Sequence, residues 1–201
     1  MKHEGWAELG IPPGSERSDV LDAYLRLLID RAVPLGMIAA SDEARVRDRH
    51  LIDCLRASSL FLPADSSAID LGSGAGLPGI PLAVTHPEVH FTLVESRKRR
   101  AAFLELTVEK LGLGNITVFP GRVEELTERA DLCLARAFAA LARCWLMAAD
   151  HLLPGGRLIY WAGGSFDVAS VQGVLPKGVA IVVTDTLKLE RFGPLVMMTR
   201  Q

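Results

Sequence analysis

Residues 69–79 read Ile-Asp-Leu-Gly-Ser-Gly-Ala-Gly-Leu-Pro-Gly, and this stretch decides the fold. An apolar strand runs into a turn with glycines at alternate positions, and the turn opens a helix. Glycines permit a tight turn and let a ligand approach main-chain N–H groups closely. Pro78 is tolerated because the first turn of a helix has no partner for its missing N–H. The stretch therefore predicts a strand, a ligand-binding loop and a helix in direct succession.

From residue 67 onward, short apolar runs alternate with helical stretches. The predicted strands span residues 68–71, 90–95, 116–119, 131–135, 157–161, 179–187 and 194–199, and the predicted helices span residues 78–85, 97–111, 138–151 and 166–175. This alternation is typical of a parallel sheet with helices on both faces. Residues 188–193 suit a hairpin, so the last strand is expected to be antiparallel. The sequence thus predicts an α/β fold whose Rossmann-like, seven-stranded, mostly parallel sheet resembles the plan of class I methyltransferases.

Two helices are predicted before the sheet begins. Ser18 is expected to cap a helix that continues to about residue 31, and Ser41 is expected to cap the next helix. We therefore expect an N-terminal helical extension, residues 1–62, packed on a single globular core formed by residues 63–201.

The charge balance is close to neutral. The chain has 201 residues, with 22 Lys and Arg against 24 Asp and Glu, and a formal net charge of -2 at pH 7. Hydrophobic residues make up 49% and charged residues 23%, which is ordinary for a globular protein and excludes the disordered and collagen-like classes. A diffusely basic nucleic-acid-binding protein is also disfavoured. Any contact with nucleic acid therefore needs a local basic patch.

The three cysteines, at positions 54, 133 and 144, have no close spacing. This pattern predicts neither a disulfide framework nor a metal site, and it favours a reducing cytosol. Residues 1–6 lack the apolar run of a signal peptide, and no stretch reaches the ~20 apolar residues of a membrane span. We expect a cytoplasmic protein without a metal or a membrane partner.

The glycine loop suits two cofactors, a dinucleotide and S-adenosylmethionine. Glu95 lies at the tip of the second strand, about 20 residues beyond the loop, where a carboxylate can accept both ribose hydroxyls of an adenosine. Asp70 decides between the two: it would repel a diphosphate but favour an ammonium and a sulfonium, directly or through water. A glycine turn that only connects strand and helix is the remaining alternative. The residues assigned to the S-adenosylmethionine site are Asp70, Gly72, Ser73, Gly74, Gly76 and Glu95.

Five segments form a pattern more specific than the glycine loop alone. They are residues 76–83 (Gly-Leu-Pro-Gly-Ile-Pro-Leu-Ala), 49–55 (Arg-His-Leu-Ile-Asp-Cys-Leu), 91–96 with 98–99, 122–125 (Arg-Val-Glu-Glu) and 135–139 (Ala-Arg-Ala-Phe-Ala). With these segments the chain resembles the bacterial 16S ribosomal RNA methyltransferase G family, also called glucose-inhibited division protein B. The resemblance extends from about residue 20 to residue 160.

The resemblance implies an enzyme that uses S-adenosylmethionine and acts on N7 of one guanine in 16S ribosomal RNA, either naked or in a small-subunit particle. It implies that Gly72 and Leu77 contact the cofactor and that Val123 and Glu124 border its adenine. Arg136 would lie at the far edge of the same pocket. Guanine N7 has a free lone pair, so no base must first remove a proton and no catalytic residue is assigned.

A compact basic cluster follows the cofactor motif. Residues 61–96 contain four acids and no Lys or Arg, and Arg97, Lys98, Arg99 and Arg100 come directly after them. On charge pattern alone, contact with RNA phosphates and a solvated surface run are equal alternatives. The resemblance favours RNA, and we assign these four residues to the substrate surface.

Arg49 and His50 are assigned to the substrate as well. Arg45, Arg49 and Asp53 follow at four-residue spacing, which would place them on one face of the second helix. Pairing of the two arginines with acids of the same helix is the alternative. For His50 the alternative is a packed, hydrogen-bonded side chain.

Arg136 ends an apolar strand and would be costly to bury alone, so it predicts a ligand anion or an acidic neighbour. The aromatic residues expected near strand ends, where an exposed guanine can stack, are Phe138, Tyr160 and Trp161. Trp145 and Met147 occupy helical positions typical of the core.

Two departures from the family pattern lie where a substrate would be met. The family's Trp-Asn and Asn-Leu-Thr elements are replaced by residues 31–32 and 36–38, and its Lys after the fifth strand is Ala162. These departures leave two alternatives open. One is a relative that methylates a small molecule, and the other is a non-catalytic nucleotide-binding protein. The oligomeric state is also left open.

Overall fold

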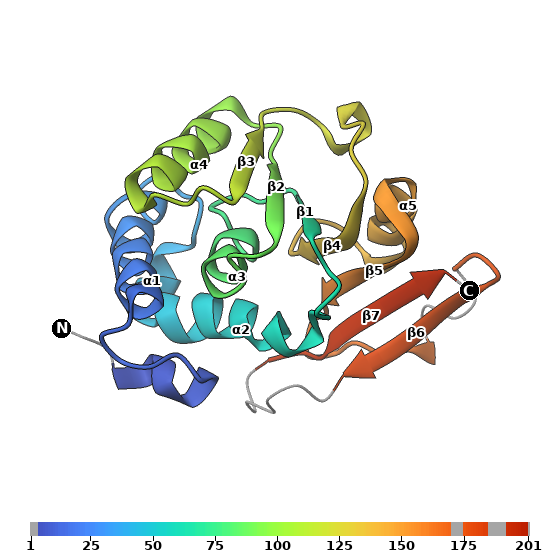
Figure 1. Cartoon of the computed structure of the whole chain (residues 1–201), viewed down its shortest axis with the longest axis horizontal. Helices are drawn as coiled ribbons and strands as arrows, with labels where there is room; N and C mark the ends of the chain where they lie inside the picture. The colour runs from blue at the N-terminus through green and yellow to red at the C-terminus, as the bar shows by residue number, and fades with distance from the viewer. Residues whose placement is uncertain (1–3, 170–174, 185–191, 201) are drawn as a thin grey trace.

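The computed structural model describes residues 4–169, 175–184 and 192–200. Within these residues seven strands form one sheet in the order β3-β2-β1-β4-β5-β7-β6 (Figure 1). Their bounds are β1 Ser67–Leu71, β2 His90–Val94, β3 Ile116–Phe119, β4 Ala130–Arg136, β5 Leu152–Trp161, β6 Val179–Thr184 and β7 Leu195–Arg200. Strands β1 to β5 pair in parallel, and β7 is antiparallel to β5 and β6. The predicted sheet with its antiparallel last strand is confirmed.

Strand β5 is longer than predicted. It begins at Leu152, directly after α5 (Leu141–His151), whereas the sequence placed its start at residue 157. Ala130 pairs with Leu152, and the register then shifts so that Leu132 pairs with Arg157. The Pro-Gly-Gly run at 154–156, which reads as a turn, therefore belongs to an irregularity inside the strand.

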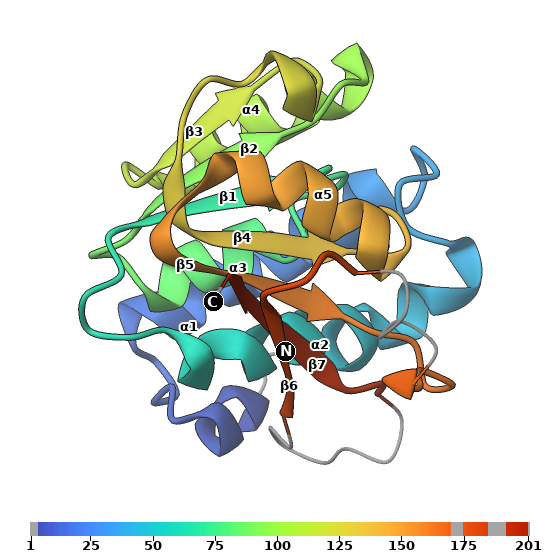
Figure 2. The same ribbon diagram turned by 90° about the vertical axis from the view of Figure 1, so that its right-hand side faces the viewer.

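Helices cover both faces of the sheet, as predicted (Figure 2). One buried cluster packs α1 (Glu16–Leu27), α3 (Gly79–Thr85) and α4 (Lys98–Leu111) on one face, and a second cluster packs α5 on the other. Helix α5 begins three residues later than predicted, because residues 137–140 form the turn that leaves β4. None of the helices in the described ranges is long and apolar enough to cross a membrane.

Two predicted elements fall partly outside the described residues. Residues 166–168 of the predicted helix 166–175 are not helical, and residues 170–174 are not described. Residues 185–187 of the sixth predicted strand, and all but residues 192 and 193 of the predicted hairpin connection, are likewise outside the described ranges.

The first helix is capped by Ser15 and not by Ser18. Ser15 has an extended backbone, and its side-chain oxygen accepts a hydrogen bond from the Ser18 N–H at 3.3 Å. The cap therefore precedes Glu16, and Ser18 is buried inside the first turn. The α-helix ends at Leu27 and continues as a wider π-turn, η2 (Leu28–Ala32), so the helical stretch reaches its predicted end near residue 31 in a different helix type.

The second predicted helix is a chain of short turns, and Ser41 does not cap it. The elements are the 3-10 turn η3 (Ala40–Arg45), the π-turn η4 (Arg47–Leu51), α2 (Ile52–Leu55) and the 3-10 turn η5 (Arg56–Leu60), and Ala39 is the residue before the first. The buried apolar residues of this segment are Val46, Leu51, Ile52, Cys54, Leu55 and Ala57. On one regular α-helix they would point in nearly every direction, so a single apolar stripe cannot bury them.

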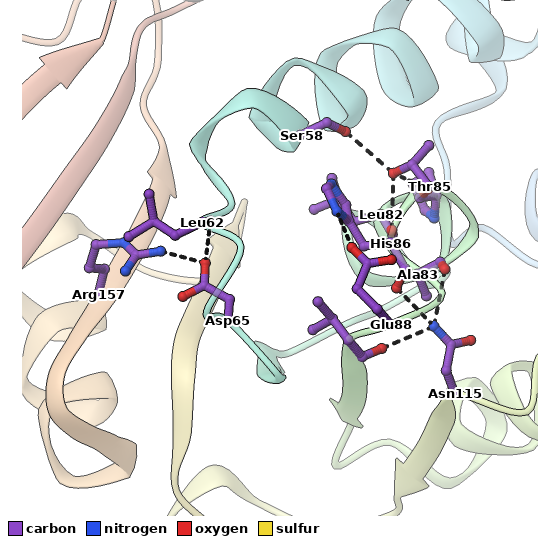
Figure 3. Close-up of polar contacts among 12 residues, drawn as sticks. Ser58, Leu62, Asp65, Leu82, Ala83, Thr85, His86, Glu88, Asn115 and Arg157 are labelled. Carbon is purple, nitrogen blue, oxygen red and sulfur yellow. Dashed lines mark hydrogen bonds and ion pairs between the residues drawn. The ribbon is translucent and has the colours of Figure 1, made fainter. Parts of the chain in front are cut away.

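The edge of the sheet where β1 and β5 begin is tied together by polar contacts (Figure 3). Arg157 of β5 bonds through Nη2 to Asp65 Oδ2 at 2.6 Å, and the Leu62 N–H donates to the same oxygen at 2.7 Å. Across the sheet, Asn115 Nδ2 donates to the Ala83 carbonyl at 3.1 Å. These contacts fix the chain where it enters β1 and leave the loops at the opposite edge free to build a site.

Candidate functional site

The glycine loop connects β1 to α3 in the predicted order. Gly72, Gly74 and Gly76 have φ angles of +71°, +60° and +96°, which glycine adopts far more readily than other residues. Within the loop the Ser73 N–H donates to the Val94 carbonyl at 2.9 Å. The loop is thereby attached to the end of β2 as well as to β1.

Asp70 lies beneath the loop and is 1% exposed. Its Oδ2 accepts a hydrogen bond from the Gly79 N–H at 3.1 Å, while its Oδ1 is buried with no hydrogen-bond partner among the described residues. Burial raises the pKa of this carboxyl to about 7. Asp70 therefore supports the loop from below, and a nearby positive charge would stabilise its ionised form.

Glu95 joins the loop to the end of β2 and is 5% exposed. Its Oε2 accepts a hydrogen bond from the Gly74 N–H at 3.0 Å, and its Oε1 accepts one from the Arg97 N–H at 2.8 Å. Arg100 Nη1 lies 3.9 Å from Oε2. Each carboxylate oxygen has two lone pairs, so both retain capacity for a ligand hydroxyl.

A cavity of about 420 Å³ lies beside this carboxylate. Its lining comprises Gly72, Val94, Glu95, Ser96, Arg97, Arg100, Gly121, Arg122, Val123, Glu124, Ala137, Phe138, Arg143 and Met147. Of the residues assigned to the cofactor, Gly72, Glu95, Val123 and Glu124 line the cavity. Ser73, Gly74, Gly76 and Leu77 stand outside this lining and form the loop behind it. The structure thus brings the loop and the short turn η6 (Val123–Glu125) to one space.

Phe138 forms the wall of this cavity against the glycine loop. A Cβ atom on Gly72 would lie 2.3 Å from Phe138 Cδ2, so the ring packs directly on the Gly72 backbone. The preceding residue, Ala137, has a φ of +52°, which is uncommon for a residue with a side chain. A ligand that lies along Gly72 must share this space with the ring or turn it aside.

The sequence missed two cavity residues on α5. Arg143 and Met147 are four positions apart and share the helix face that looks into the cavity. Met147 was expected in the core but is half-buried, whereas the predicted core position of Trp145 is confirmed at 2% exposure. The four-residue spacing was the available signal, but an apolar residue at that position reads as core.

The sequence also missed the role of Tyr24, which read as part of an apolar helix face. Its hydroxyl donates to the Ala75 carbonyl of the glycine loop at 2.8 Å, and the side chain is fully buried. A residue of α1 therefore holds the loop that follows β1.

Arg136 does not line the cavity described above. Its Nε donates to Asp53 Oδ2 at 3.0 Å, and its Nη2 donates to His50 Nδ1 at 3.0 Å and to the Arg49 carbonyl at 3.3 Å. The acidic neighbour expected from the sequence is therefore Asp53 of the N-terminal segment. This contact joins the end of β4 to α2.

His50 is a packed, hydrogen-bonded residue. Its Nδ1 accepts from Arg136, so the proton lies on Nε2, which is 3.2 Å from Asp42 Oδ2. Burial and the positive charge of Arg136 lower the pKa of His50. The imidazole is neutral at pH 7 and links Asp42 to Arg136.

A second cleft, of about 470 Å³, lies on the other side of Arg136. It is lined by Arg45, Asp48, Arg49, Asp53, Arg136, Gly163, Gly164, Phe192 and Gly193. Arg56 closes its base, since Nη2 donates to Asp53 Oδ1 at 2.7 Å and to the Gly193 carbonyl at 3.0 Å. The predicted common face of Arg45, Arg49 and Asp53 is thus found in the cleft wall.

The residues assigned to the substrate fall into two groups. Arg97 and Arg100 line the first cavity, whereas Lys98 and Arg99 are exposed and line neither space. Arg49 lines the second cleft, with His50 packed behind it.

Of the three aromatic candidates for base stacking, Phe138 alone lines one of these two spaces. Trp161 is 7% exposed and donates through Nε1 to the Asp53 carbonyl at 2.9 Å. Tyr160 donates to the Ala139 carbonyl at 3.1 Å. Trp161 is therefore a core residue, contrary to expectation, and supports the wall that carries Asp53.

Comparison with known proteins agrees with this architecture. A family model described as rRNA small subunit methyltransferase G matches residues 17–168. The protein of that name from Thermobifida fusca is 41% identical over 150 residues, which cover 74% of this chain and 63% of the relative. The one from Mycolicibacterium vanbaalenii is 33% identical over 204 residues, covering 96% and 87%. The chain thus matches less than two thirds of the Thermobifida protein but most of the Mycolicibacterium protein.

Solved structures of other methyltransferases share the fold at low identity. A putative methyltransferase, yhhF, from Escherichia coli has a TM-score of 0.58 at 14% identity, over 77% of this chain and 89% of that one. A ribosomal protein L11 methylase from Lactobacillus delbrueckii has a TM-score of 0.57 at 14% identity, over 74% and 76%. The expected class I methyltransferase fold is thereby confirmed.

Proposed function

The chain belongs to the rRNA small subunit methyltransferase G family, and from this premise we propose that it methylates N7 of a guanine in 16S ribosomal RNA. Members of the family depend on S-adenosylmethionine, as the sequence predicted. The observation that carries the proposal is the cavity between the glycine loop, Glu95 and η6. It lies at the carboxyl edge of the parallel strands, where ligands bind in open α/β sheets.

The residues present fit an adenosine that carries a positive sulfur. Glu95 accepts hydroxyls at the end of β2, and Val123 and Glu124 border the same space. The Oδ1 of Asp70, which has no hydrogen-bond partner among the described residues, would place a negative charge beneath the loop for a cation above it. S-adenosylmethionine, when bound, supplies a methyl group already activated by its sulfonium.

Methyl transfer to guanine N7 requires little from the protein beyond positioning of the guanine and the methyl donor. The nitrogen attacks with a lone pair that carries no proton, so a general base is unnecessary. Accordingly, the described lining of the cavity has neither a histidine nor a cysteine. Rate enhancement would come from in-line placement of the two groups and from stabilisation of charge on the purine.

The partner in this proposal is 16S ribosomal RNA, as a naked strand or in the small-subunit particle, and the protein would act in the cytoplasm. We call the cavity beside Glu95, which would hold the methyl donor, the donor cavity. Arg97 and Arg100 would contact RNA beside it, while Lys98 and Arg99 would add charge from the exposed start of α4. The RNA must present an unstacked guanine, from a loop or by flipping.

The test compares purified 16S RNA before and after incubation with the protein and S-adenosylmethionine, by mass spectrometry of nucleosides. New N7-methylguanine is expected from the wild type. It should be absent from Glu95→Ala and present with the control Glu88→Ala, which alters an exposed carboxylate. No N7-methylguanine from the wild type, on naked RNA or on small subunits, would sink the proposal and favour a small-molecule acceptor.

A further inference from the structure

In and around the second cleft, pairs of arginines share single carboxylates among the described residues. Asp42 forms ion pairs with Arg45 at 3.5 Å and Arg49 at 3.3 Å, and its Oδ2 also accepts a hydrogen bond from the neutral His50 at 3.2 Å. Asp53 in turn serves both Arg56 and Arg136. Among the described residues, Arg45 and Arg49 thus share one carboxylate, so the charge of these two guanidinium groups is only partly neutralised there.

The anions and cations are also exposed to different degrees. The side chain of Asp42 is 10% exposed, whereas those of Arg45 and Arg49 are 56% and 55% exposed. The remaining acid of the lining, Asp48, pairs with Arg47. The buried carboxylates therefore hold the arginines from behind, while the guanidinium groups face the solvent of the cleft.

The rest of the cleft lining consists of Phe192 and three glycines, Gly163, Gly164 and Gly193. A Cβ on Gly163 or Gly164 would meet nothing within 4 Å, so the backbone after β5 is open to a ligand. The volume of about 470 Å³ falls in the range of sites for ligands the size of a nucleotide. Arginine in such a setting binds phosphate oxygens with two parallel hydrogen bonds.

The cleft lies beside the donor cavity. Arg136 lines the cleft, and the next two residues, Ala137 and Phe138, line the cavity. A strand of nucleic acid that places a base toward Phe138 would extend its backbone into the cleft.

We propose that this cleft binds a backbone phosphate of the RNA strand that carries the target guanine, with Arg45 and Arg49 as its phosphate ligands. The choice of RNA as the source of the phosphate rests on the proposed function. The cleft and the basic start of α4 thereby bind the acceptor RNA together.

The test is the salt dependence of RNA binding, which is read without catalysis. The double variant Arg45→Gln, Arg49→Gln removes both phosphate ligands. Arg129→Gln, Arg200→Gln is the matched control, since it removes the same charge from exposed residues that line a different cavity. Binding of a 16S RNA transcript is measured by filter retention at several KCl concentrations, and S-adenosylmethionine affinity by calorimetry.

The cleft variant should bind RNA about tenfold more weakly, with a slope of log K against log salt lower by about 0.7 to 0.9, as expected for the loss of one phosphate contact. Its melting temperature and cofactor affinity should match the wild type. Arg45→Lys, Arg49→Lys should recover the slope, because the charges return. The control should keep the slope of the wild type to within about half of that change.

Equal losses in the cleft variant and the control, or an unchanged slope in the cleft variant, would overturn this proposal. Failure of the proposed function has a different signature. The wild type would then form no N7-methylguanine, whatever the binding slopes show.

Discussion

The donor cavity and the second cleft, which is lined by Arg45, Arg49 and Arg136, lie side by side but are assembled in different ways. The contact that organises the cavity joins Gly74 to Glu95, 21 positions apart, within a strand–loop–helix–strand unit. The cleft depends on Arg136 with Asp53, 83 positions apart, and on Arg56 with Gly193, 137 positions apart. The part of the cavity made by this local unit leaves a motif in the sequence, whereas a site held together by distant segments leaves only scattered charges.

The largest expected effect falls on the long-range contacts of the cleft. Asp53→Ala removes the carboxylate that Arg56 and Arg136 share, and loss of one partner from a buried ion pair lowers the free energy of unfolding by about 3–5 kcal/mol. The control Glu43→Ala, an exposed residue of the same segment, should change it by less than about 0.5 kcal/mol. Urea denaturation measures the free energy of unfolding of both variants. Similar values would show that the ion pairs of Asp53 contribute no more to stability than an ordinary surface residue.

The next largest effect is on S-adenosylmethionine affinity, and it separates the cost of backbone strain in the glycine loop from the cost of a clash with Phe138. Gly72 and Gly74 have similar φ angles, so an alanine at either position costs about 1–2 kcal/mol of strain. Only at Gly72 does the new Cβ meet Phe138, since the nearest atom at Gly74 is 3.9 Å away. Gly72→Ala should therefore weaken S-adenosylmethionine binding by about 100-fold and Gly74→Ala by about tenfold, as measured by calorimetry.

A double variant identifies the cause of that difference. Adding Phe138→Ala to Gly72→Ala should restore most of the excess loss, because the clash disappears. If the double variant binds no better than Gly72→Ala, the ring of Phe138 is not what excludes a side chain at this position.

A smaller effect tests whether the donor cavity is as local as it looks. Tyr24→Phe removes the hydroxyl that bonds to Ala75, leaving a buried carbonyl with one partner fewer. The free energy of unfolding should fall by about 1–2 kcal/mol, and cofactor affinity by a few-fold. Thermal melting and calorimetry measure the two. Loss of stability with unchanged affinity would mean that the loop keeps its shape without the N-terminal helix.

The smallest expected effect is the release of a proton when the cofactor binds. Since burial raises the pKa of Asp70 to about 7, the carboxyl is largely neutral at pH 6 in the free protein. A cation bound above it lowers that pKa, so cofactor binding at pH 6 should release up to one proton. Calorimetry in two buffers with different ionisation enthalpies measures the release. Asp70→Asn should abolish it, and buffer-independent binding by the wild type would place the cofactor's charge away from Asp70.

The stability of the free protein also depends on the protonation of Asp70. The folded pKa is raised above the value of an unfolded carboxyl, about 3.9. The native state therefore binds more protons than the unfolded state between these values, and this contribution to stability is lost as the pH rises through 7. Asp70→Asn should flatten that part of the profile.

The sequence was most informative where function and local structure coincide. The glycine loop, Glu95 and the pair Val123 and Glu124 were all assigned to the cofactor, and all of them line one cavity, the loop through Gly72. The mostly parallel sheet followed from the alternation of strands and helices, which is typical of that architecture. The helix caps were less readable, since Ser15 and Ser18 are equally good candidates until the backbone is known.

Residue types and spacing thus determined the strands, the loop and the class of cofactor, because each is encoded by a short stretch of the chain and its periodicity. Tertiary structure alone decided which anion neutralises Arg136, that Phe138 covers Gly72, and that Arg45 and Arg49 face an open cleft. The physical reason is that a charge or ring is satisfied by whatever packing brings near it. Periodicity shows which side of an element is buried, but not what lies against it.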